Sequence, residues 1–93
     1  ALASLGHGNV VAARAVISPY ATLGQHVQIG AGAVIDARAT LADFAQVGPG
    51  AIIGAGVTLA EGAFVGAGAT LVAGLTVGKN ARIGAGSVVV ENV

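Results

Sequence analysis

Residues whose side chains could do chemistry are few in this chain, and they are scattered. Two histidines are present, His7 and His26, but there is no cysteine, which excludes disulfides and thiolate metal ligands. The densest cluster is IDARATLADFAQVGPG at residues 35–50, with two aspartates and one arginine but no histidine, serine or cysteine. We therefore predict no metal site, and we expect Asp36 and Arg38 to form a local ion pair.

The charges and the lone histidines exclude several classes of function. A lone surface histidine is more often inert than catalytic, so we assign no catalytic role to His7 or His26. Four acidic and four basic side chains balance to zero net charge, which leaves no charged surface for nucleic acid or an anionic membrane. Residues 15–35 are uncharged, as a membrane-spanning helix would be, but Gly, Pro, Gln and His interrupt them regularly. We therefore expect no membrane segment.

Length and composition favour a single small domain that spans residues 1–93. Only three aromatic residues are present, without Met or Trp, so the core must consist of Val, Ile, Leu and Ala. No basic, signal-type segment opens the chain, and its first residue is alanine. From these features we expect an excised or processed fragment, with the cytoplasm as the default location.

An aliphatic residue recurs at every sixth position along the whole chain. The fifteen positions are Leu5, Val11, Ile17, Leu23, Ile29, Ile35, Leu41, Val47, Ile53, Leu59, Val65, Leu71, Val77, Ile83 and Val89. A mostly small residue lies two positions before each, and glycine is frequent one and three positions after it, as in the GAG triplets that begin at residues 30, 54, 66 and 84. This period excludes an amphipathic helix, whose apolar residues recur every 3.6 positions.

Each hexad reads as a short strand followed by a corner, because residues two apart point to the same side of a strand and glycine tolerates positive φ. Three hexads would form one 18-residue coil of a triangular solenoid, in which each strand pairs in parallel with the strand 18 residues away. We predict an all-β fold, a parallel β-helix of about five 18-residue coils without insertion loops. Strand spacing of about 4.8 Å gives a prism about 24 Å long.

A period of 18 residues also sorts the outward side chains into columns, one on each face. The threonine column contains Thr22, Thr40, Thr58 and Thr76, the mixed column Val10, Gln28, Gln46, Phe64 and Arg82, and the apolar column Val16, Val34, Ile52, Thr70 and Val88. A contiguous apolar stripe usually marks an interface. We predict that Val16, Val34, Ile52 and Val88 pack at the interface of a homotrimer. The alternative is that β-branched residues simply suit strands.

Across all 93 residues the sequence resembles the hexapeptide-repeat proteins, whose fold is the left-handed parallel β-helix. The resemblance is strongest to the C-terminal domain of bacterial sialic-acid and nucleotide-sugar acetyltransferases, in the segments IGAGAVID (29–36), ADFAQVGPGAIIGAG (42–56), EGAFVGAGATLVAGLTVG (61–78) and ARIGAGSVVVENV (81–93). The resemblance implies a homotrimer that uses acetyl-CoA as cosubstrate. In such enzymes a separate nucleotide-sugar-binding domain precedes the helix, and it is absent from these 93 residues.

The same resemblance implies a catalytic site whose histidines are missing. Family members typically carry a general-base histidine in a segment similar to D-H-D, and Asp36, Ala37 and Arg38 match that segment. A second family histidine, near the thioester, matches Gln46. Neither alanine nor glutamine titrates near neutrality. We therefore predict no catalytic residue in this chain as it stands.

Binding of acyl-CoA depends less on side chains in these relatives, because the pantetheine arm bonds mainly to backbone amides between subunits. The matching positions are Gln46, Ala67 and Ala85, which we predict as cofactor-binding residues. Lys79 and Arg82 are the candidates to meet the phosphates, although ordinary solvated charges would look the same.

Two main functions stay open from the sequence. The first is a trimeric β-helix domain of the sugar acetyltransferase type that is impaired because Ala37 occupies the general-base position. The alternative is an engineered or excised, non-catalytic β-solenoid scaffold. Ice binding by the threonine column is less favoured, because its companion column is Gly24, Ala42, Ala60 and Gly78 rather than a second row of threonines.

Overall fold

The computed structural model describes residues 4–5 and 8–93, with side chains from residue 8 onward. The described chain forms fifteen two-residue strands in three parallel five-stranded sheets. The first sheet contains β1 (Ser4–Leu5), β4 (Thr22–Leu23), β7 (Thr40–Leu41), β10 (Thr58–Leu59) and β13 (Thr76–Val77). The second contains β2 (Val10–Val11), β5 (Gln28–Ile29), β8 (Gln46–Val47), β11 (Phe64–Val65) and β14 (Arg82–Ile83). The third contains β3 (Val16–Ile17), β6 (Val34–Ile35), β9 (Ile52–Ile53), β12 (Thr70–Leu71) and β15 (Val88–Val89).

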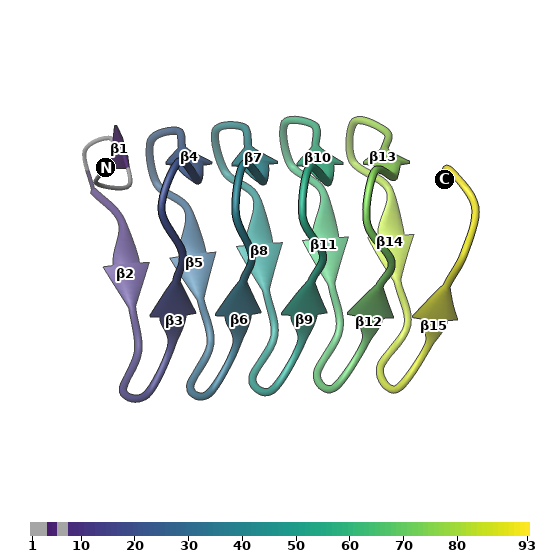
Figure 1. The fold of residues 1–93 in the computed structure, drawn as a ribbon, viewed down its shortest axis with the longest axis horizontal. Helices are drawn as coiled ribbons and strands as arrows, with labels where there is room; N and C mark the ends of the chain where they lie inside the picture. The colour runs from purple at the N-terminus through teal and green to yellow at the C-terminus, as the bar shows by residue number, and fades with distance from the viewer. Residues whose placement is uncertain (1–3, 6–7) are drawn as a thin grey trace.

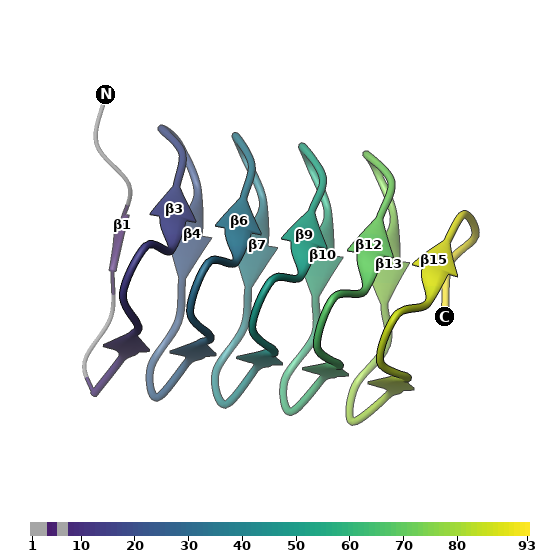
Figure 2. The same ribbon diagram turned by 90° about the horizontal axis from the view of Figure 1, so that it is seen from below.

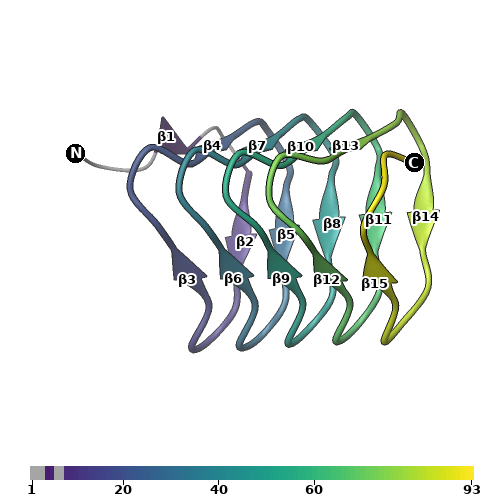
Figure 3. The ribbon, with the colours of Figure 1, turned by 45° about the vertical axis from the view of Figure 1, so that its right-hand side comes forward.

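Consecutive strands belong to different sheets, so the chain winds as a three-sided coil. In Figure 1 it rises through the near sheet, crosses the top away from the viewer and descends through the far sheet while advancing from left to right, which makes the coil left-handed. Figure 2 shows the same coils stacked side by side from below, and Figure 3 shows two sheets meeting along the lower corner. The solenoid measures 28 × 21 × 21 Å. The predicted fold class and handedness are therefore confirmed.

The register of the sheets sorts the outward residues as the 18-residue period predicts. Thr40 pairs with Thr22 and Thr58, Gln46 with Gln28 and Phe64, and Ile52 with Val34 and Thr70. We name the three sheets by these columns: the threonine face (β1, β4, β7, β10, β13), the mixed face (β2, β5, β8, β11, β14) and the apolar face (β3, β6, β9, β12, β15).

The interior of the prism is entirely aliphatic. Leu41, Ile53 and Val65 are buried to 1% exposure or less, as are the alanines two positions before them, Ala39, Ala51 and Ala63. No polar or charged side chain is buried among the residues with described side chains. Because each coil contributes the same inward positions, the core is one continuous column that stabilises every coil through its neighbours.

The corners are held by backbone hydrogen bonds between neighbouring coils. At the mixed–apolar corner (residues 31–32, 49–50, 67–68 and 85–86), Gly68 N donates to the carbonyl of Pro49 at 2.9 Å, and Gly86 N to that of Ala67 at 2.8 Å. The glycines that precede this corner are required because the backbone of the next coil passes very close to them. A Cβ added to Gly48 would lie 2.5 Å from Ala67 N, so only glycine fits there.

Six of the described corner residues other than glycine adopt positive φ: Arg14, Tyr20, His26, Arg38, Phe44 and Asn80. Four of them form stacked pairs between neighbouring coils. The Arg38 guanidinium lies 5.6 Å from the centre of the Tyr20 ring, and the rings of His26 and Phe44 stack with centroids 5.3 Å apart.

These pairs add little net stability compared with glycine. The left-handed conformation costs a non-glycine residue roughly 1–2 kcal/mol, of which about 0.4–1 kcal/mol is recovered because glycine makes the unfolded chain more flexible. Each pair contains two such residues, so the remaining cost is roughly 0–3 kcal/mol per pair. An exposed cation–π or aromatic contact returns about 0.5–1.5 kcal/mol of it, so a pair adds little or no net stability.

The first and last coils are less well buried than the repeat pattern predicts. Val11 is 42% exposed and Ile17 and Val89 are half-buried, because each has a neighbouring coil on one side only among the described residues. The side chain of Leu5 lies outside the described residues. At the other end, Val93 N donates to the carbonyl of Thr76 at 3.0 Å and Gly78 N donates to the carbonyl of Val93 at 2.7 Å, so the last residues cover the edge of β13. The described part of the chain contains no helix that could span a bilayer.

The buried column predicts a sharp contrast between adjacent residues of β7. We expect Leu41→Ala to lower the free energy of unfolding by about 2–5 kcal/mol, because it opens a cavity in the shared core. Thr40→Ala, on the outward side of the same strand, should change it by less than about 1 kcal/mol. Urea unfolding followed by circular dichroism measures both. Equal losses for the two variants would contradict the inward–outward assignment.

Candidate functional site

The mixed face carries a shallow groove of about 260 Å³. Its lining residues are Val10, Gln28, Ile29, Gly30, Gln46, Val47, Gly48, Pro49 and Phe64. None of them is charged, and the only polar side chains are the amides of Gln28 and Gln46, which are neighbours in register. Two amides among apolar side chains suit a ligand that alternates methylene and amide groups. The groove is open and smaller than the roughly 300–1,000 Å³ of pockets that enclose a ligand, so one chain supplies only one wall.

Unused backbone donors lie beside this groove, at the mixed–apolar corner. The carbonyl of Ala67 accepts the corner bond from Gly86 N, but the amide N–H groups of Ala67 and Ala85 have no hydrogen-bond partner among the described residues. A side chain at Gly48 would cover Ala67 N, and one at Gly66 would cover Ala85 N, each from 2.5 Å. Glycine therefore leaves both donors accessible. The three predicted cofactor-binding positions, Gln46, Ala67 and Ala85, thus lie on one face and its adjoining corner.

The charged residues near the end of the mixed face are exposed. The Arg82 guanidinium lies 5.4 Å from the centre of the Phe64 ring, and Phe64 also lines the groove. Lys79 Nζ lies 4.0 Å from a carboxylate oxygen of Glu61, and both side chains are more than half exposed. Such an exposed pair is weak, so both cations can still meet an anion from solvent.

The segment that matches the D-H-D motif is held differently from what the sequence predicts. Asp36 Oδ1 accepts a hydrogen bond from Ala37 N at 2.7 Å, and Arg38 stacks over Tyr20. The predicted Asp36–Arg38 ion pair is therefore wrong. The reason is local: Arg38 adopts a φ of 61°, and its side chain follows the corner toward the neighbouring coil.

The two positions that match family histidines are far apart within one chain. Ala37 lies at the apolar–threonine corner (residues 19–20, 37–38, 55–56 and 73–74), whereas Gln46 lies on the mixed face, which is the side of the prism opposite that corner. Side chains at these two positions cannot reach the same reacting atom in one chain. They could meet only across a contact between two chains.

The remaining titratable side chains that the structure describes form no catalytic cluster. Asp43, for which the sequence shows no partner, accepts a hydrogen bond from Gln25 N at 2.8 Å. His26 stacks on Phe44 at a different corner from Ala37, and His7 lies outside the described residues. Among residues whose side chains are described, no group of three His, Cys, Asp or Glu could hold a metal ion.

Most side chains of the apolar column are exposed to solvent in the single chain. Val16, Ile52 and Val88 are 51%, 44% and 68% exposed, and Val34 is half-buried. They lie in register on one flat sheet, β3–β6–β9–β12–β15.

Sequence analysis did not identify the groove itself. Gln28 and Phe64 share a column with Gln46 in the 18-residue period, so their alignment was detectable, but the hollow depends on the glycines and Pro49 at the adjoining corner. The arrangement is an open groove of the kind that suits an extended ligand. It offers backbone and side-chain donors without a group that could accept a proton near neutral pH.

Comparison with known proteins agrees with the fold. Residues 26–61 and 58–91 match the family described as bacterial transferase hexapeptide (six repeats). No match was found among curated protein sequences.

Several solved structures share the fold over nearly the whole chain. The acetyltransferase domain of PglB from Neisseria gonorrhoeae FA1090 superposes with a TM-score of 0.87 at 26% identity, over 98% of this chain and 47% of that one. The same domain in complex with acetyl coenzyme A gives 0.53 at 28% identity, over 92% and 47%. A Caulobacter crescentus perosamine N-acetyltransferase with one histidine replaced by asparagine, in complex with CoA and GDP-perosamine, gives 0.79 at 28% identity, over 97% and 50%.

This chain spans about half the length of those solved chains. Its structural neighbours are β-helix domains of sugar acetyltransferases, and the repeat that defines them runs through it without interruption. The chain belongs to the bacterial transferase hexapeptide-repeat family.

Proposed function

We propose that this chain is the CoA-binding β-helix of a sugar acetyltransferase-type homotrimer, and that it binds acyl-CoA without efficient turnover. The observation that carries the proposal is the groove on the mixed face, where two glutamine amides line an apolar hollow beside the free amides of Ala67 and Ala85. Neighbouring proteins of the same fold are solved with CoA or acetyl-CoA bound.

The chemistry of the groove fits the pantetheine arm of CoA. That arm alternates short methylene segments with two amide groups, which matches the apolar lining around Gln28 and Gln46. Arg82 follows Phe64 in the same column and Lys79 lies near it in the chain, so the phosphates would lie toward the last described coil. Acetyl-CoA would then be held with its thioester toward Gln46.

A homotrimer would complete the site. The groove is one open wall, and the positions of Ala37 and Gln46 can share a ligand only if they come from two chains. The exposed apolar column of Val16, Val34, Ile52 and Val88 supplies the contact, since burying each aliphatic side chain contributes up to roughly 1.5–3 kcal/mol.

Catalysis is the step we expect to be impaired. The acceptor amine or hydroxyl must lose a proton as it attacks the thioester carbonyl, and a positioned base typically contributes about 10²–10⁴-fold to the rate. Ala37 cannot accept that proton, and the neighbouring Asp36 carboxylate is engaged by the hydrogen bond from Ala37 N. We propose the cytoplasm as its location, where acetyl-CoA is supplied.

The alternative is a β-solenoid scaffold, engineered or excised, with no ligand of its own. The regular coils and the absence of a base favour it. The two functions differ in one respect that can be measured directly, which is whether the isolated chain binds CoA.

We expect calorimetry to show CoA binding to the isolated chain, and Gln46→Glu to weaken it about tenfold, which is about 1.4 kcal/mol. The substitution removes an amide donor and brings a negative charge to an anionic ligand. Thr40→Glu adds the same charge on the threonine face and serves as the control. Absence of binding to the unaltered chain would favour the scaffold.

Restoring the histidines tests the impaired step. We expect Ala37→His with Gln46→His to raise thioester consumption with an amino-sugar nucleotide by roughly 10²–10⁴-fold. A mixture of the two single variants should recover part of that gain, because the two positions meet only between chains. If only the double variant on a single chain were active, and the mixture never, the shared inter-chain site would be wrong.

The trimer has its own test in light scattering. We expect the unaltered chain to have three times its 8.8 kDa mass, and Val34→Lys with Ile52→Lys to give monomers or insoluble protein, since two charges would have to be buried. Thr22→Lys with Thr40→Lys places the same charges on the threonine face. An unchanged trimer in the first variant would remove the apolar face from the interface.

A further inference from the structure

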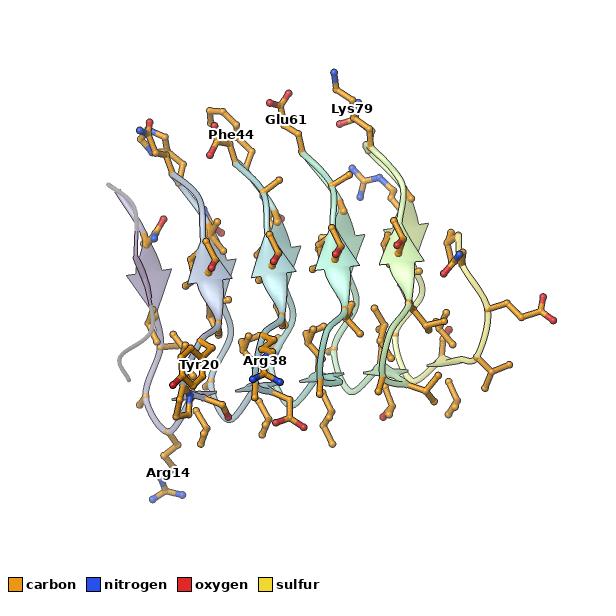
Figure 4. All side chains as sticks on the ribbon, turned by 45° about the horizontal axis from the view of Figure 1, so that its top comes forward. Arg14, Tyr20, Arg38, Phe44, Glu61 and Lys79 are labelled. Atoms are coloured by element: carbon orange, nitrogen blue, oxygen red, sulfur yellow. The ribbon has the colours of Figure 1, made fainter. Side chains whose placement is uncertain are left out.

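The threonine face carries a second surface feature, which the proposed function does not use. Thr22 and Thr40 project from β4 and β7, are exposed, and have no hydrogen-bond partner for their hydroxyls among the described residues. The stacked pairs flank these two strands: Tyr20 with Arg38 on one edge, and His26 with Phe44 on the other. Figure 4 shows Tyr20 and Arg38 along one edge of this face and Phe44 along the opposite edge.

Among the described residues, the pairs on this face are confined to one part of it. On the next two coils the corresponding corner positions are glycine at residues 56, 62 and 74, with Asn80 the exception. Bulky residues thus adopt the left-handed conformation at the corners beside β4 and β7. Glycine could adopt the same conformation there without strain. Stability does not account for them, because one stacked contact does little more than offset the strain of the two residues that form it. Strained residues of this kind gather at binding sites.

The ring faces and the guanidinium remain available to a ligand. Tyr20 is 57% and Phe44 56% exposed. No carboxylate among the described residues forms an ion pair with Arg38, whose planar group presents several donors to an anion. Between the two edges lies a floor of threonine hydroxyls with the small residues Gly24 and Ala42. Two carboxylates lie at its edges, and each accepts a backbone hydrogen bond: Asp36 from Ala37 N, and Asp43, which lies against Gly24, from Gln25 N.

We propose that this part of the threonine face binds an acidic oligosaccharide. Sugar rings stack their C–H faces on aromatic rings, their hydroxyls exchange hydrogen bonds with threonine, and a carboxylate pairs with Arg38. The surface is the outer side of one sheet, and such an open surface suits an extended chain more than an enclosed small molecule. The site lies on a different face from the groove, so it does not depend on CoA binding.

Glycine variants test the proposal, because they keep the corner conformation and remove only the side chains. The probe is a short oligogalacturonate, with the neutral galacto-oligosaccharide of the same length for comparison, in calorimetry with the full chain. We expect the acidic probe to bind and the neutral one to bind at least tenfold more weakly. Tyr20→Gly with Arg38→Gly, and His26→Gly with Phe44→Gly, should each weaken the acidic probe at least tenfold while the melting temperature stays nearly unchanged.

Arg14→Gly is the matched control, since Arg14 is also exposed and at positive φ but lies at the mixed–apolar corner without a stacking partner. It should leave probe binding unchanged. The proposal is overturned if the acidic probe does not bind, if both probes bind equally, or if Arg14→Gly weakens binding as much as the paired variants. A lowered melting temperature with unchanged binding would show that the pairs are structural. Binding of a single-stranded oligonucleotide in place of the sugar, with the same sensitivity to the variants, would overturn the ligand class.

Discussion

The dry aliphatic column at the centre of the prism is the constraint on which the rest of the structure depends. Every sixth side chain enters it, so every strand must lie in register with the strand 18 residues away. A shift by one residue would turn Leu41 outward and Thr40 inward, together with the same pair in every coil. The column therefore fixes which residues reach each surface, and the three faces acquire their separate characters from it.

Each face therefore has a different surface chemistry and suits a different kind of contact. The mixed face has an uncharged groove with paired amides and neighbouring backbone donors, the apolar face has exposed aliphatic residues in register, and the threonine face has hydroxyls between stacked pairs. The one histidine among the described residues, His26, stacks on Phe44 at a different corner from Ala37. Under the proposed function, this chain keeps the scaffold of an acyl-transfer site, while position 37 carries alanine in place of a proton acceptor.

The sequence predicted the architecture well because the hexad encodes it at every position. The strands, the parallel register and the outward columns all follow from one period, without long-range information. The ends depart from it, as Val11 shows, because burial requires a coil on both sides. The corners were predicted less well, since side chains there choose among local partners. Asp36 bonds to the backbone of Ala37, Asp43 to that of Gln25, and Arg38 stacks on Tyr20. The groove was missed because it is a shape formed by glycines at Gly30 and Gly48 rather than a pattern of reactive residues.

A crystal structure of the chain grown with saturating CoA tests the central claim most directly, namely that the register of the sheets assembles a CoA site on the mixed face. The account predicts the pantetheine arm along that face beside Gln46, with the amides of Ala67 and Ala85 as donors and the Ala37 corner of a second chain opposite. CoA bound on the threonine face, or a site enclosed by one chain alone, would contradict it.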